Sequence, residues 1–414
     1  MDHLRIALLS MHSCPWSKPG GRYTGGMNVY IRNLSREMGK LGIATDIYTC
    51  SHEGDELCSF SGPAGNVRLI HVDSGSCGWM AEAGQADYAG SLAQAVHSYC
   101  RELDLRYDLI HSHYWLSGLA GNHLKDLWQV PHVSMFHTLG ALKNSSLLGA
   151  MEPVSRISHE KLIINSCDRI IASTPVEKLE MVNRYGAPAD KISVIPCGID
   201  LLLFRPVHRQ AARAICGLPE KKTLLFVGRP DPIKGLENLL RAASMLRQGS
   251  DFQLLVIGCG NRYMGDWWQA AGQHGGDDIT DRVIFTGPVE HEKMYLYYNA
   301  ADLCVIPSYY ESFCLTALES VACGTPVLAT RVGEIPQISR LSSLCKTIPD
   351  NSPGSLARHI SIFLDGNGKD SDRPGSALSI HYGWDSIARR ITREYEYVSR
   401  VPVNAVKAAT QIVY

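Results

Sequence analysis

Two carboxylates interrupt an apolar segment in the second half of the chain. Glu311 and Glu319 stand eight positions apart in the stretch SYYESFCLTALE. That spacing first suggests a paired general acid and base. The residues from Thr316 to Ala322 indicate a helix, which puts Glu311 in the preceding loop and Glu319 about one turn inside the helix. The alternative is that both are capping or solvated carboxylates on a helix that faces a core.

A pair of cations follows the first strand expected in the second half. The stretch VGRPDPIKG places Arg229 and Lys234 five positions apart, with Gly228 and Gly235 around them. Arginine offers a planar fork of N–H donors and lysine a point charge, and the combination suits a diphosphate. The alternative is that both are solvated surface charges.

A glycine pair precedes a helix expected in the first half. Gly25 and Gly26 end at a segment whose apolar residues recur at three- and four-residue steps from Met27 to Leu41. Unpaired N–H groups and the positive end of the helix dipole can hold a phosphate or a sugar oxygen there. Asn28, just inside the helix, is placed to point toward such a ligand. A plain glycine-rich loop would explain the same residues.

Histidines mark the ends of two strands expected in the first half. His111 and His113 share one face of the strand YDLIHSH by the period of two, and His137 ends VPHVSMFH. A zinc site needs three or four convergent ligands, and the sequence fixes no others. We therefore expect hydrogen bonding or packing from these histidines, and no metal site.

Composition excludes several classes of protein. A chain of 414 residues exceeds the ~250–300 residues of a single core, so two domains are expected. With 40 Lys and Arg against 41 Asp and Glu, no net field draws the chain to nucleic acid or a membrane surface. There is no spanning segment and no secretory signal, and the 13 cysteines form no Cys-x-x-Cys pair. A cytoplasmic protein with reduced core cysteines is expected.

The elements that must position these residues alternate regularly. Short runs of Val, Ile and Leu alternate with helix-period segments, as in parallel strands buried by crossover helices. The strands expected in the first half are LRIALLS, IATDIYT, VRLIHV, YDLIHSH, VPHVSMFH, RIIAST and ISVIPCG. Those expected in the second half are TLLFVGR, FQLLVIG, RVIFTG, DLCVIPS and TPVLAT.

The predicted fold class is therefore α/β, with two doubly wound, Rossmann-like domains. Residues 1–197 form the first domain and 198–383 the second, and a helix over 384–402 is expected to pack back on the first. Open parallel sheets bind ligands at the carboxyl ends of their strands, so the motifs should gather there, in a cleft between the domains. No G-x-S-x-G elbow or Walker A loop occurs, which excludes several hydrolase and NTPase classes.

Taken together, six stretches resemble the retaining glycosyltransferase family 4, whose GT-B fold has two Rossmann-like domains facing a central cleft. They are TGGMNVYIRNLSREMGKLG, HSHYWLSGLAG, FHTLGALKN, SVIPCGIDLLLFRP, VGRPDPIKG and ESFCLTALESVACGTPVLATRVGEIPQI. Within that family they look most similar to the glycosyltransferases of mycothiol synthesis, which join N-acetylglucosamine to inositol phosphate, and less to sucrose-phosphate synthases. The resemblance implies a hexosyltransferase whose donor is a nucleotide diphosphate sugar, most often UDP-linked, held mainly by the second domain.

The resemblance also implies roles on the donor side. Arg229 and Lys234 would neutralise the diphosphate as its bond to the sugar breaks. Glu311 would bind a hydroxyl of the transferred sugar, Glu319 the ribose hydroxyls and His137 the donor sugar. The remaining donor-binding residues would be Gly25, Gly26, Gly228, Val289, Phe313, Cys314 and Leu315.

The chemistry that the resemblance implies needs no cofactor. The leaving phosphate is thought to accept the acceptor's proton on one face of the sugar, and two positioned cations replace a metal ion. The family usually has glycine where this chain has Cys314.

Acceptor residues follow from the same resemblance. Four residues fall where the mycothiol enzymes contact inositol phosphate: Asn28, Tyr114, Thr138 and Arg156. Those enzymes also use a lysine, and here no Lys or Arg occurs between Arg68 and Arg101. Each charge-assisted hydrogen bond lost in this way is worth ~1.5–3 kcal/mol. The expected acceptor is a small polyol, an inositol phosphate or a sugar, phosphorylated or not.

Two other classes share this architecture. One is a nucleotide-sugar 2-epimerase, although the Arg–Lys pair with two glutamates fits a transferase better. The other is a non-catalytic nucleotide-sugar-binding protein, although a decayed site would not need the catalytic set of Arg229, Lys234, Glu311 and His137. The expected partners are thus a UDP-sugar and a small polyhydroxylated acceptor, with no nucleic acid. The choice between monomer and homodimer stays open.

Overall fold

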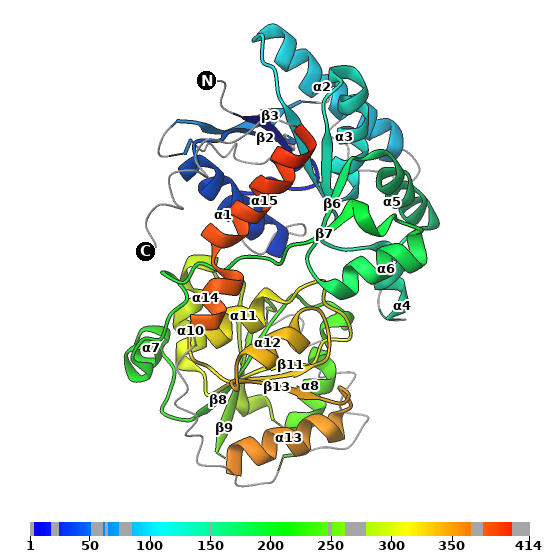
Figure 1. The fold of residues 1–414 in the computed structure, drawn as a ribbon. Helices are drawn as coiled ribbons and strands as arrows, with labels where there is room; N and C mark the ends of the chain where they lie inside the picture. Colours follow the sequence, from blue (N-terminus) through cyan, green and yellow to red (C-terminus); the bar gives the residue numbers. More distant parts are fainter. Residues whose placement is uncertain are drawn as a thin grey trace. The chain divides into compact units, whose positions relative to one another are not determined.

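The computed structural model describes residues 4–17, 25–50, 61–62, 65–73, 85–146, 148, 151–246, 251–260, 279–365 and 376–399. The chain divides into two compact units, each built on a parallel sheet (Figure 1). Unit 1 comprises Met1–Ser145, Glu152–Gly198 and Trp384–Tyr414, and unit 2 comprises Ser146–Met151 and Ile199–Gly383.

Seven parallel strands form the sheet of unit 1, in the order β3-β2-β1-β4-β5-β6-β7. They are β1 (Arg5–Leu9), β2 (Ala44–Cys50), β3 (Val67–Val72), β4 (Leu109–His113), β5 (His132–Met135), β6 (Arg169–Ala172) and β7 (Ile192–Val194). All seven strands expected in the first half are confirmed, because strands buried on both faces leave a continuous apolar signal. The strand order reverses between β1 and β4, which is where such sheets bind ligands.

Helices cover this sheet and join its strands. They are α1 (Gly26–Lys40), α2 (Gln85–Glu102), α3 (Trp115–Trp128), α4 (Gly140–Ser145), α5 (Val154–Ser166), α6 (Pro175–Tyr185), η1 (Ala189–Lys191) and α15 (Trp384–Ser399). The expected helix after β1 is confirmed as α1, which buries Tyr30, Ile31, Leu34 and Met38. Its period of three and four residues thus places one apolar stripe against the sheet.

The helix α15 comes from the far end of the chain and packs on α1 within unit 1 (Figure 1). Nε of Arg169 on β6 donates to Oε2 of Glu394 at 2.6 Å. Nδ1 of His111 on β4 lies 2.6 Å from the hydroxyl of Tyr395. These contacts bind α15 to the sheet. Residues 400–402, which the sequence assigns to the same helix, lie outside the described residues.

Six parallel strands form the sheet of unit 2, in the order β10-β9-β8-β11-β12-β13. They are β8 (Lys222–Val227), β9 (Phe252–Ile257), β10 (Val283–Gly287), β11 (Leu303–Ile306), β12 (Val327–Thr330) and β13 (Cys345–Ile348). Sequence reasoning found the first five and missed β13. This edge strand reads Cys-Lys-Thr-Ile with Lys346 exposed, so it lacks the unbroken apolar run of a central strand.

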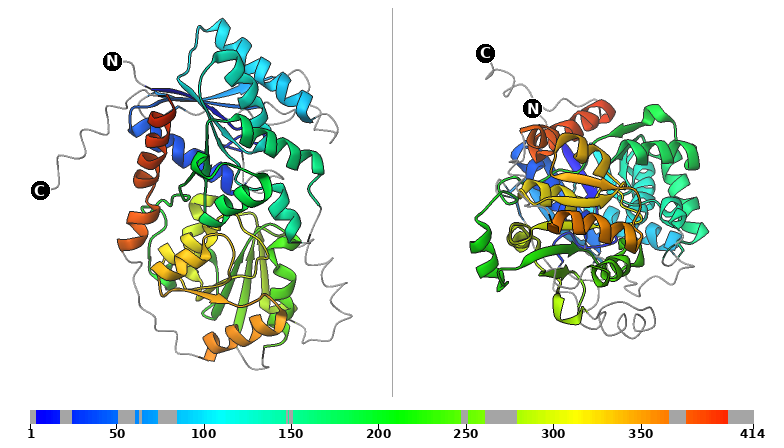
Figure 2. Two further views of the ribbon diagram at one scale, coloured as in Figure 1. Left: turned by 45° about the vertical axis from the view of Figure 1, so that its right-hand side comes forward. Right: turned by 90° about the horizontal axis from the view of Figure 1, so that it is seen from below.

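The helices of unit 2 are mostly short. Those in the described ranges are α7 (Arg209–Cys216), η2 (Pro232–Lys234), α8 (Leu236–Ser244), η3 (Thr280–Arg282), η4 (His291–Lys293), α10 (Met294–Ala300), α11 (Leu315–Ala322), α12 (Ile335–Leu341), α13 (Pro353–Asp365) and α14 (Ser376–Tyr382). The helices α8 and α13 pack together on one face of the sheet, and α10, α11 and α12 cover the other (Figure 2). Among the helices that the structure describes, none is both long and apolar enough to cross a membrane.

Cysteine behaves as a small core residue in this chain. The structure describes 11 of the cysteines, and ten of these are buried. Cys304 on β11 and Cys323 after α11 are examples that the sequence placed in apolar segments. The expectation of core cysteines is therefore confirmed for these residues.

Candidate active site

Lys234 and Glu311 form an ion pair at the carboxyl ends of two neighbouring strands, β8 and β11. Nζ of Lys234 donates to both carboxylate oxygens of Glu311, at 2.8 Å each. Oγ of Ser308 also donates to Oε1 of Glu311, at 2.8 Å. Burial disfavours the charged form of Lys234, but the charge of Glu311 and its hydrogen bonds raise the pKa of Lys234 above its ordinary value. Lys234 therefore keeps its proton at neutral pH.

Close packing between the backbone segments that carry Lys234 and Glu311 holds the two side chains together. Gly235 has φ +70°, and a Cβ there would stand 2.2 Å from the carbonyl oxygen of Pro307. Only glycine fits such an approach. The N–H of Tyr309 donates to the carbonyl of Ile233 at 2.8 Å, which ties η2 to the residues after β11. The two strand ends therefore hold the ion pair as one rigid group.

Arg229 stands beside this pair, directly after Gly228 at the end of β8. Its charge acts on Lys234 and disfavours the protonated lysine. A Cβ at Gly258, after β9, would stand 2.4 Å from the carbonyl oxygen of Gly228, so the ends of β8 and β9 are also in close contact. The structure thus brings together Arg229, Lys234 and Glu311, as sequence reasoning expected. Two neighbouring cations at strand ends suit a bound anion.

Glu319 lies buried on α11, with both carboxylate oxygens engaged. Nε2 of His291 lies 2.8 Å from Oε1, and the hydroxyl of Tyr298 donates to Oε2 at 2.7 Å. Burial and then the charge of Glu319 raise the pKa of Tyr298 well above its ordinary value, so Tyr298 stays a donor. Sequence reasoning missed both partners. His291 follows soon after the strand RVIFTG, and that position was the available signal. Tyr298 had none beyond its place in a helical pattern.

The loop between Glu311 and α11 has strained backbone. Cys314 precedes the helix with φ +86°, in the left-handed region that disfavours a side chain with a Cβ. Burial and the charge of Glu311 raise the pKa of the Cys314 thiol well above its ordinary value, so the thiol stays neutral. Phe313 is buried, Leu315 begins α11, and Val289 lies half-buried between β10 and η4. Cys314 thus occupies a backbone conformation that favours glycine.

In unit 1, Asn28 binds the loop after β1. Its Oδ1 accepts from the N–H of Gly25 at 3.0 Å, and its Nδ2 donates to Oγ of Ser13 at 2.9 Å and to the carbonyl of Cys14 at 2.8 Å. Gly25 and Gly26 are exposed at the start of α1. Asn28 therefore orders the loop and the glycine turn, which differs from the expected orientation toward a ligand.

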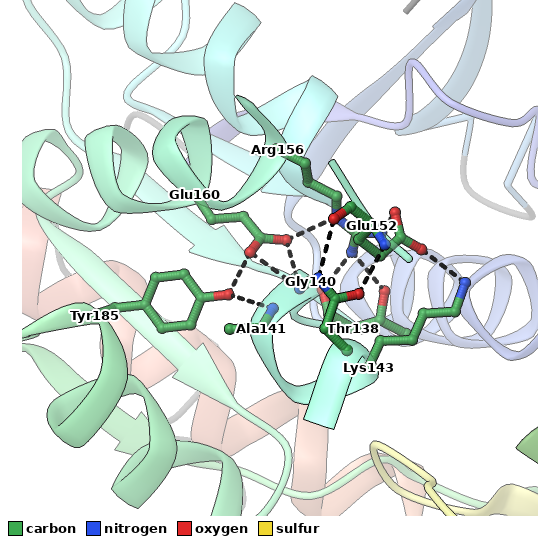
Figure 3. A network of polar contacts seen from close by, with 9 residues as sticks. Thr138, Gly140, Ala141, Lys143, Glu152, Arg156, Glu160 and Tyr185 are labelled. Carbon is green, nitrogen blue, oxygen red and sulfur yellow. Dashed lines mark hydrogen bonds and ion pairs between the residues drawn. The ribbon is translucent and has the colours of Figure 1, made fainter. Parts of the chain in front are cut away.

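Tyr114, Thr138 and Arg156 meet within unit 1, although they lie far apart in the sequence. The guanidinium of Arg156 lies over the ring of Tyr114, with its carbon 4.9 Å from the ring centroid. Nη2 of Arg156 donates to the carbonyl and to Oγ1 of Thr138, at 3.1 and 3.0 Å (Figure 3). Tyr114 follows β4 and Thr138 follows β5, so neighbouring strand ends position them.

Two carboxylates neutralise Arg156. Its Nε donates to Oε1 of Glu160 at 2.8 Å, and its Nη1 lies 2.8 Å from Oε2 of Glu152 (Figure 3). Lys143 donates to the other oxygen of Glu152 at 2.7 Å. Burial alone would raise the pKa of Glu152, but the charges of Arg156 and Lys143 lower it. This arginine–carboxylate cluster therefore holds two positive and two negative side chains, and sequence reasoning found only Arg156 among these four.

Glu160 also anchors the residues after Thr138. Its two oxygens each accept from the N–H of Gly140 at 3.0 Å, at the start of α4. Tyr185 donates to Glu160 and accepts from the N–H of Ala141 (Figure 3). The segment that carries His137 and Thr138 is therefore fixed by α5 and α6.

His137 belongs to a group of rings next to this cluster. Its Nε2 lies 2.9 Å from Nδ1 of His113, and its φ is +60°. The ring of Tyr30 meets that of His137 edge-on, with centroids 5.2 Å apart. Over the described ranges, no group of three or more His, Cys, Asp or Glu side chains is arranged to hold a metal ion. The geometry is that of hydrogen bonding and packing between neutral rings.

Two family profiles match most of the chain. Residues 24–202 match the profile described as Glycosyltransferase Family 4, and residues 221–365 match the one described as Glycosyl transferases group 1. Arg229, Lys234, Glu311 and Glu319 lie inside the second match, and Tyr114, Thr138 and Arg156 inside the first.

Similar proteins span almost the whole length. D-inositol 3-phosphate glycosyltransferase 2 of Catenulispora acidiphila is 37% identical over 402 residues, which cover 93% of this chain and 92% of that protein. A D-inositol 3-phosphate glycosyltransferase of Nocardia farcinica is 38% identical over 365 residues, covering 86% and 78% of the two chains.

Solved structures give the same picture of the fold. Sucrose-phosphate synthase from Thermosynechococcus elongatus has a TM-score of 0.84 at 29% identity, covering 95% of this chain and 99% of that one. HepE from Anabaena, in complex with UDP and glucose, has a TM-score of 0.72 at 16% identity, covering 95% and 100%. The two parallel-sheet units are those of GT-B glycosyltransferases, and the chain belongs to glycosyltransferase family 4.

Proposed function

We propose that this chain is a retaining, metal-independent hexosyltransferase that moves a sugar from a UDP-sugar to a small polyhydroxylated acceptor. The observation that carries the proposal is the Lys234–Glu311 ion pair, with Arg229 beside it, at the strand ends of unit 2. Two cations next to a carboxylate match a ligand that combines a diphosphate with a hydroxylated sugar.

When the donor binds, Lys234 and Glu311 exchange part of their contact with each other for contacts with the donor. When a diphosphate arrives, Lys234 turns part of its charge from Glu311 to the phosphate oxygens, and Glu311 gains the capacity to accept from a sugar hydroxyl. Charge grows on the diphosphate as the bond to the sugar breaks, and Arg229 and Lys234 stabilise it most at that moment. Glu319 accepts from the ribose hydroxyls, since its oxygens can accept further hydrogen bonds beside those from His291 and Tyr298.

Retention and independence from metal ions belong to the same proposal. The leaving phosphate takes the proton of the attacking hydroxyl on the face that it leaves, so the product keeps the configuration of the donor sugar. Arg229 and Lys234 supply the positive charge that a divalent metal ion supplies in metal-dependent enzymes. His137 would contact the sugar with a neutral ring, because burial lowers the pKa of its imidazole to about 3.

The proposed acceptor is a polyol, an inositol phosphate or a sugar (phosphate) bound near Tyr114, Thr138 and Arg156. Relatives that match this chain over most of its length are named as D-inositol 3-phosphate glycosyltransferases, which supports an inositol-like acceptor. The carboxylates that pair with Arg156 reduce the positive charge available to a phosphate group. Phosphorylated and unphosphorylated acceptors are therefore both included in the test.

The experiment incubates the protein with UDP-N-acetylglucosamine, UDP-glucose, GDP-glucose or ADP-glucose and with inositol 3-phosphate, inositol, fructose 6-phosphate or glucose, and reads product masses. We expect a hexosylated product from a UDP-sugar, an unchanged anomeric configuration by NMR, and the same rate in EDTA. A nucleotide sugar whose configuration changes at C2 without an acceptor would indicate an epimerase instead. UDP binding with no product from any pair would contradict the transferase proposal.

A further inference from the structure

A buried hydrogen bond joins α14 to the turn before α12. The hydroxyl of Tyr382, the last residue of α14, donates to Oε1 of Glu334 at 2.9 Å. Both side chains are buried. Burial and then the charge of Glu334 raise the pKa of Tyr382, so the phenol keeps its proton and remains the donor. Neither residue belongs to the donor-binding set implied by the sequence.

Glu334 also holds the loop that leads to α11. Its backbone N–H donates to the carbonyl of Phe313 at 2.8 Å. The preceding Gly333 has φ +53°, and a Cβ there would stand 2.5 Å from the same carbonyl oxygen and 3.2 Å from Cβ of Glu311. The turn at Gly333 and Glu334 is therefore in close contact with the backbone between Glu311 and Cys314.

Anchoring the Phe313 carbonyl fixes the N–H that follows it. The carbonyl of Phe313 and the N–H of Cys314 belong to one planar peptide unit, so they cannot turn independently. The same anchor opposes the tendency of Cys314 to leave its left-handed conformation. The ring of Phe313 meets that of Tyr382 edge-on, with centroids 6.1 Å apart, so Tyr382 reaches this peptide by two routes.

Tyr382 stands where the chain passes between the units. The long segment of unit 2 begins after Gly198 and ends at Gly383. The N–H of Ile199 donates to the carbonyl of Tyr382 at 2.8 Å, and Ile199 pairs with Gly383 in a parallel bridge. The two ends of this segment are thus bound to each other, and the side chain of Tyr382 extends from them to Glu334 and Phe313.

We propose that Tyr382 and Glu334 are positioning residues for the donor, which set the peptide of Phe313 and Cys314 for contact with the diphosphate sugar. They couple that peptide to the two ends of the Ile199–Gly383 segment of unit 2. The inference rests on the proposed function, because it takes the N–H groups at the start of α11 as donor ligands.

The test begins with Tyr382→Phe, which removes only the hydroxyl. We expect KM for the UDP-sugar and Kd for UDP to rise about fivefold to tenfold, which is less than the loss of a direct hydrogen bond to a charged group, because the lost bond positions the donor peptide and does not itself contact the donor. The expected kcat stays within about twofold, since the lost contact serves ground state and transition state alike. The matched control is Tyr107→Phe in unit 1, whose hydroxyl donates to buried Asp46 at 2.7 Å and which should leave both constants unchanged.

Variants of the partner separate positioning from a general loss of stability. Glu334→Gln keeps an acceptor for Tyr382 and keeps the backbone N–H, so its KM should stay near that of the wild type. Glu334→Ala should raise KM by about as much as Tyr382→Phe does. The double variant should have a KM no higher than either single variant, because the hydrogen bond between Tyr382 and Glu334 is lost in all three. This second route still tests the proposal if Tyr382→Phe fails to fold.

The outcomes are distinguishable. A wild-type KM and Kd in a folded Tyr382→Phe, or fully additive effects in the double variant, would overturn the positioning role. Equal losses in Glu334→Gln and Glu334→Ala would also overturn it, since the amide retains the acceptor. If the wild-type protein neither binds UDP nor transfers sugar, the proposed function fails instead.

Discussion

Nζ of Lys234 lies 2.8 Å from each carboxylate oxygen of Glu311, so the cation proposed for the diphosphate and the carboxylate proposed for the sugar are each other's counter-ion. Under the proposed function, this ion pair exists before the donor binds, and the donor replaces part of it. The electrostatics of the site are therefore set before the ligand arrives, which is the condition for stabilising a transition state without reorganisation.

Lys234→Ala should reduce kcat about 100- to 1000-fold, because the developing phosphate charge loses a positioned cation. Steady-state transfer measures the change, and circular dichroism checks that the fold persists. The matched control is Lys221→Ala in the same unit, since Lys221 pairs with Asp251 at the surface and should keep full activity. Unchanged turnover in Lys234→Ala would contradict the proposal that Lys234 neutralises the phosphate charge.

Glu319→Ala should weaken UDP binding about tenfold, by removing the acceptor of the ribose hydroxyls. Titration calorimetry with UDP and with 2′,3′-dideoxy-UDP checks the assignment. The dideoxy nucleotide has no hydroxyls to lose, so the wild type and the variant should bind it equally well. A variant that loses the same factor for both nucleotides would show that Glu319 serves only His291 and Tyr298.

Cys314→Gly should be more stable than Cys314→Ala by about 1 kcal/mol, because both lose the sulfur and only alanine retains a Cβ in the left-handed region. Chemical denaturation of the two variants under the same conditions gives the difference. Equal stabilities would mean that this backbone carries no strain.

The sequence predicted the architecture well, because most central strands are continuous apolar runs. Arg229, Lys234 and Glu311 were proposed as site residues because each follows such a run, and Glu319 because it is a carboxylate within an apolar helix. It missed β13, an edge strand with an exposed lysine, because the apolar signal weakens where one side of a strand is uncovered. The sequence also did not show which of these residues pair with one another, as Lys234 and Glu311 do.

Partners that come from elsewhere in the chain left little trace in the sequence. Tyr298, Glu334 and Tyr382 read as members of helical patterns, and only packing brings their polar atoms to Glu319 and to the Phe313 loop. Glu152 and Glu160 share a helical period with Arg156, but the sequence alone does not say which of their charges are buried together. Spacing along the chain locates such residues, whereas their contacts depend on the fold.

Acidification should destabilise unit 1 well above the range in which carboxylates titrate. Burial lowers the pKa of His111 and His132 to about 3, from ordinary values near 6.5, and lowers that of His113 as well. Between those values the unfolded chain binds protons that the folded chain does not, so stability rises with pH across this window. Each histidine contributes up to about 1.4 kcal/mol per pH unit.

Thermal unfolding followed from pH 7.5 to pH 5 checks this expectation. The melting temperature should fall steadily as the pH is lowered, and His132→Gln should show a shallower fall than the wild type even if it starts lower. A melting temperature that stays flat over this range would contradict the assignment of these histidines as buried and neutral.

Glu152→Gln should shift acceptor preference toward phosphorylated compounds, because the variant leaves more of the charge of Arg156 for a phosphate. The measurement is the ratio of kcat/KM for inositol 3-phosphate to that for inositol, which should rise severalfold. Arg184→Gln is the control, since Arg184 pairs with Glu180 on α6 outside the arginine–carboxylate cluster. An unchanged ratio would place the acceptor away from Arg156.

The position of α15 also orders the events of biosynthesis. Unit 1 needs Tyr395 and Glu394 to complete its contacts with His111 and Arg169, and the ribosome makes these residues after the whole of unit 2. The long segment of unit 2 begins and ends at residues that pair with each other, Ile199 and Gly383, so it can close on itself while unit 1 still lacks its last helix. Unit 2 is therefore expected to mature first during translation.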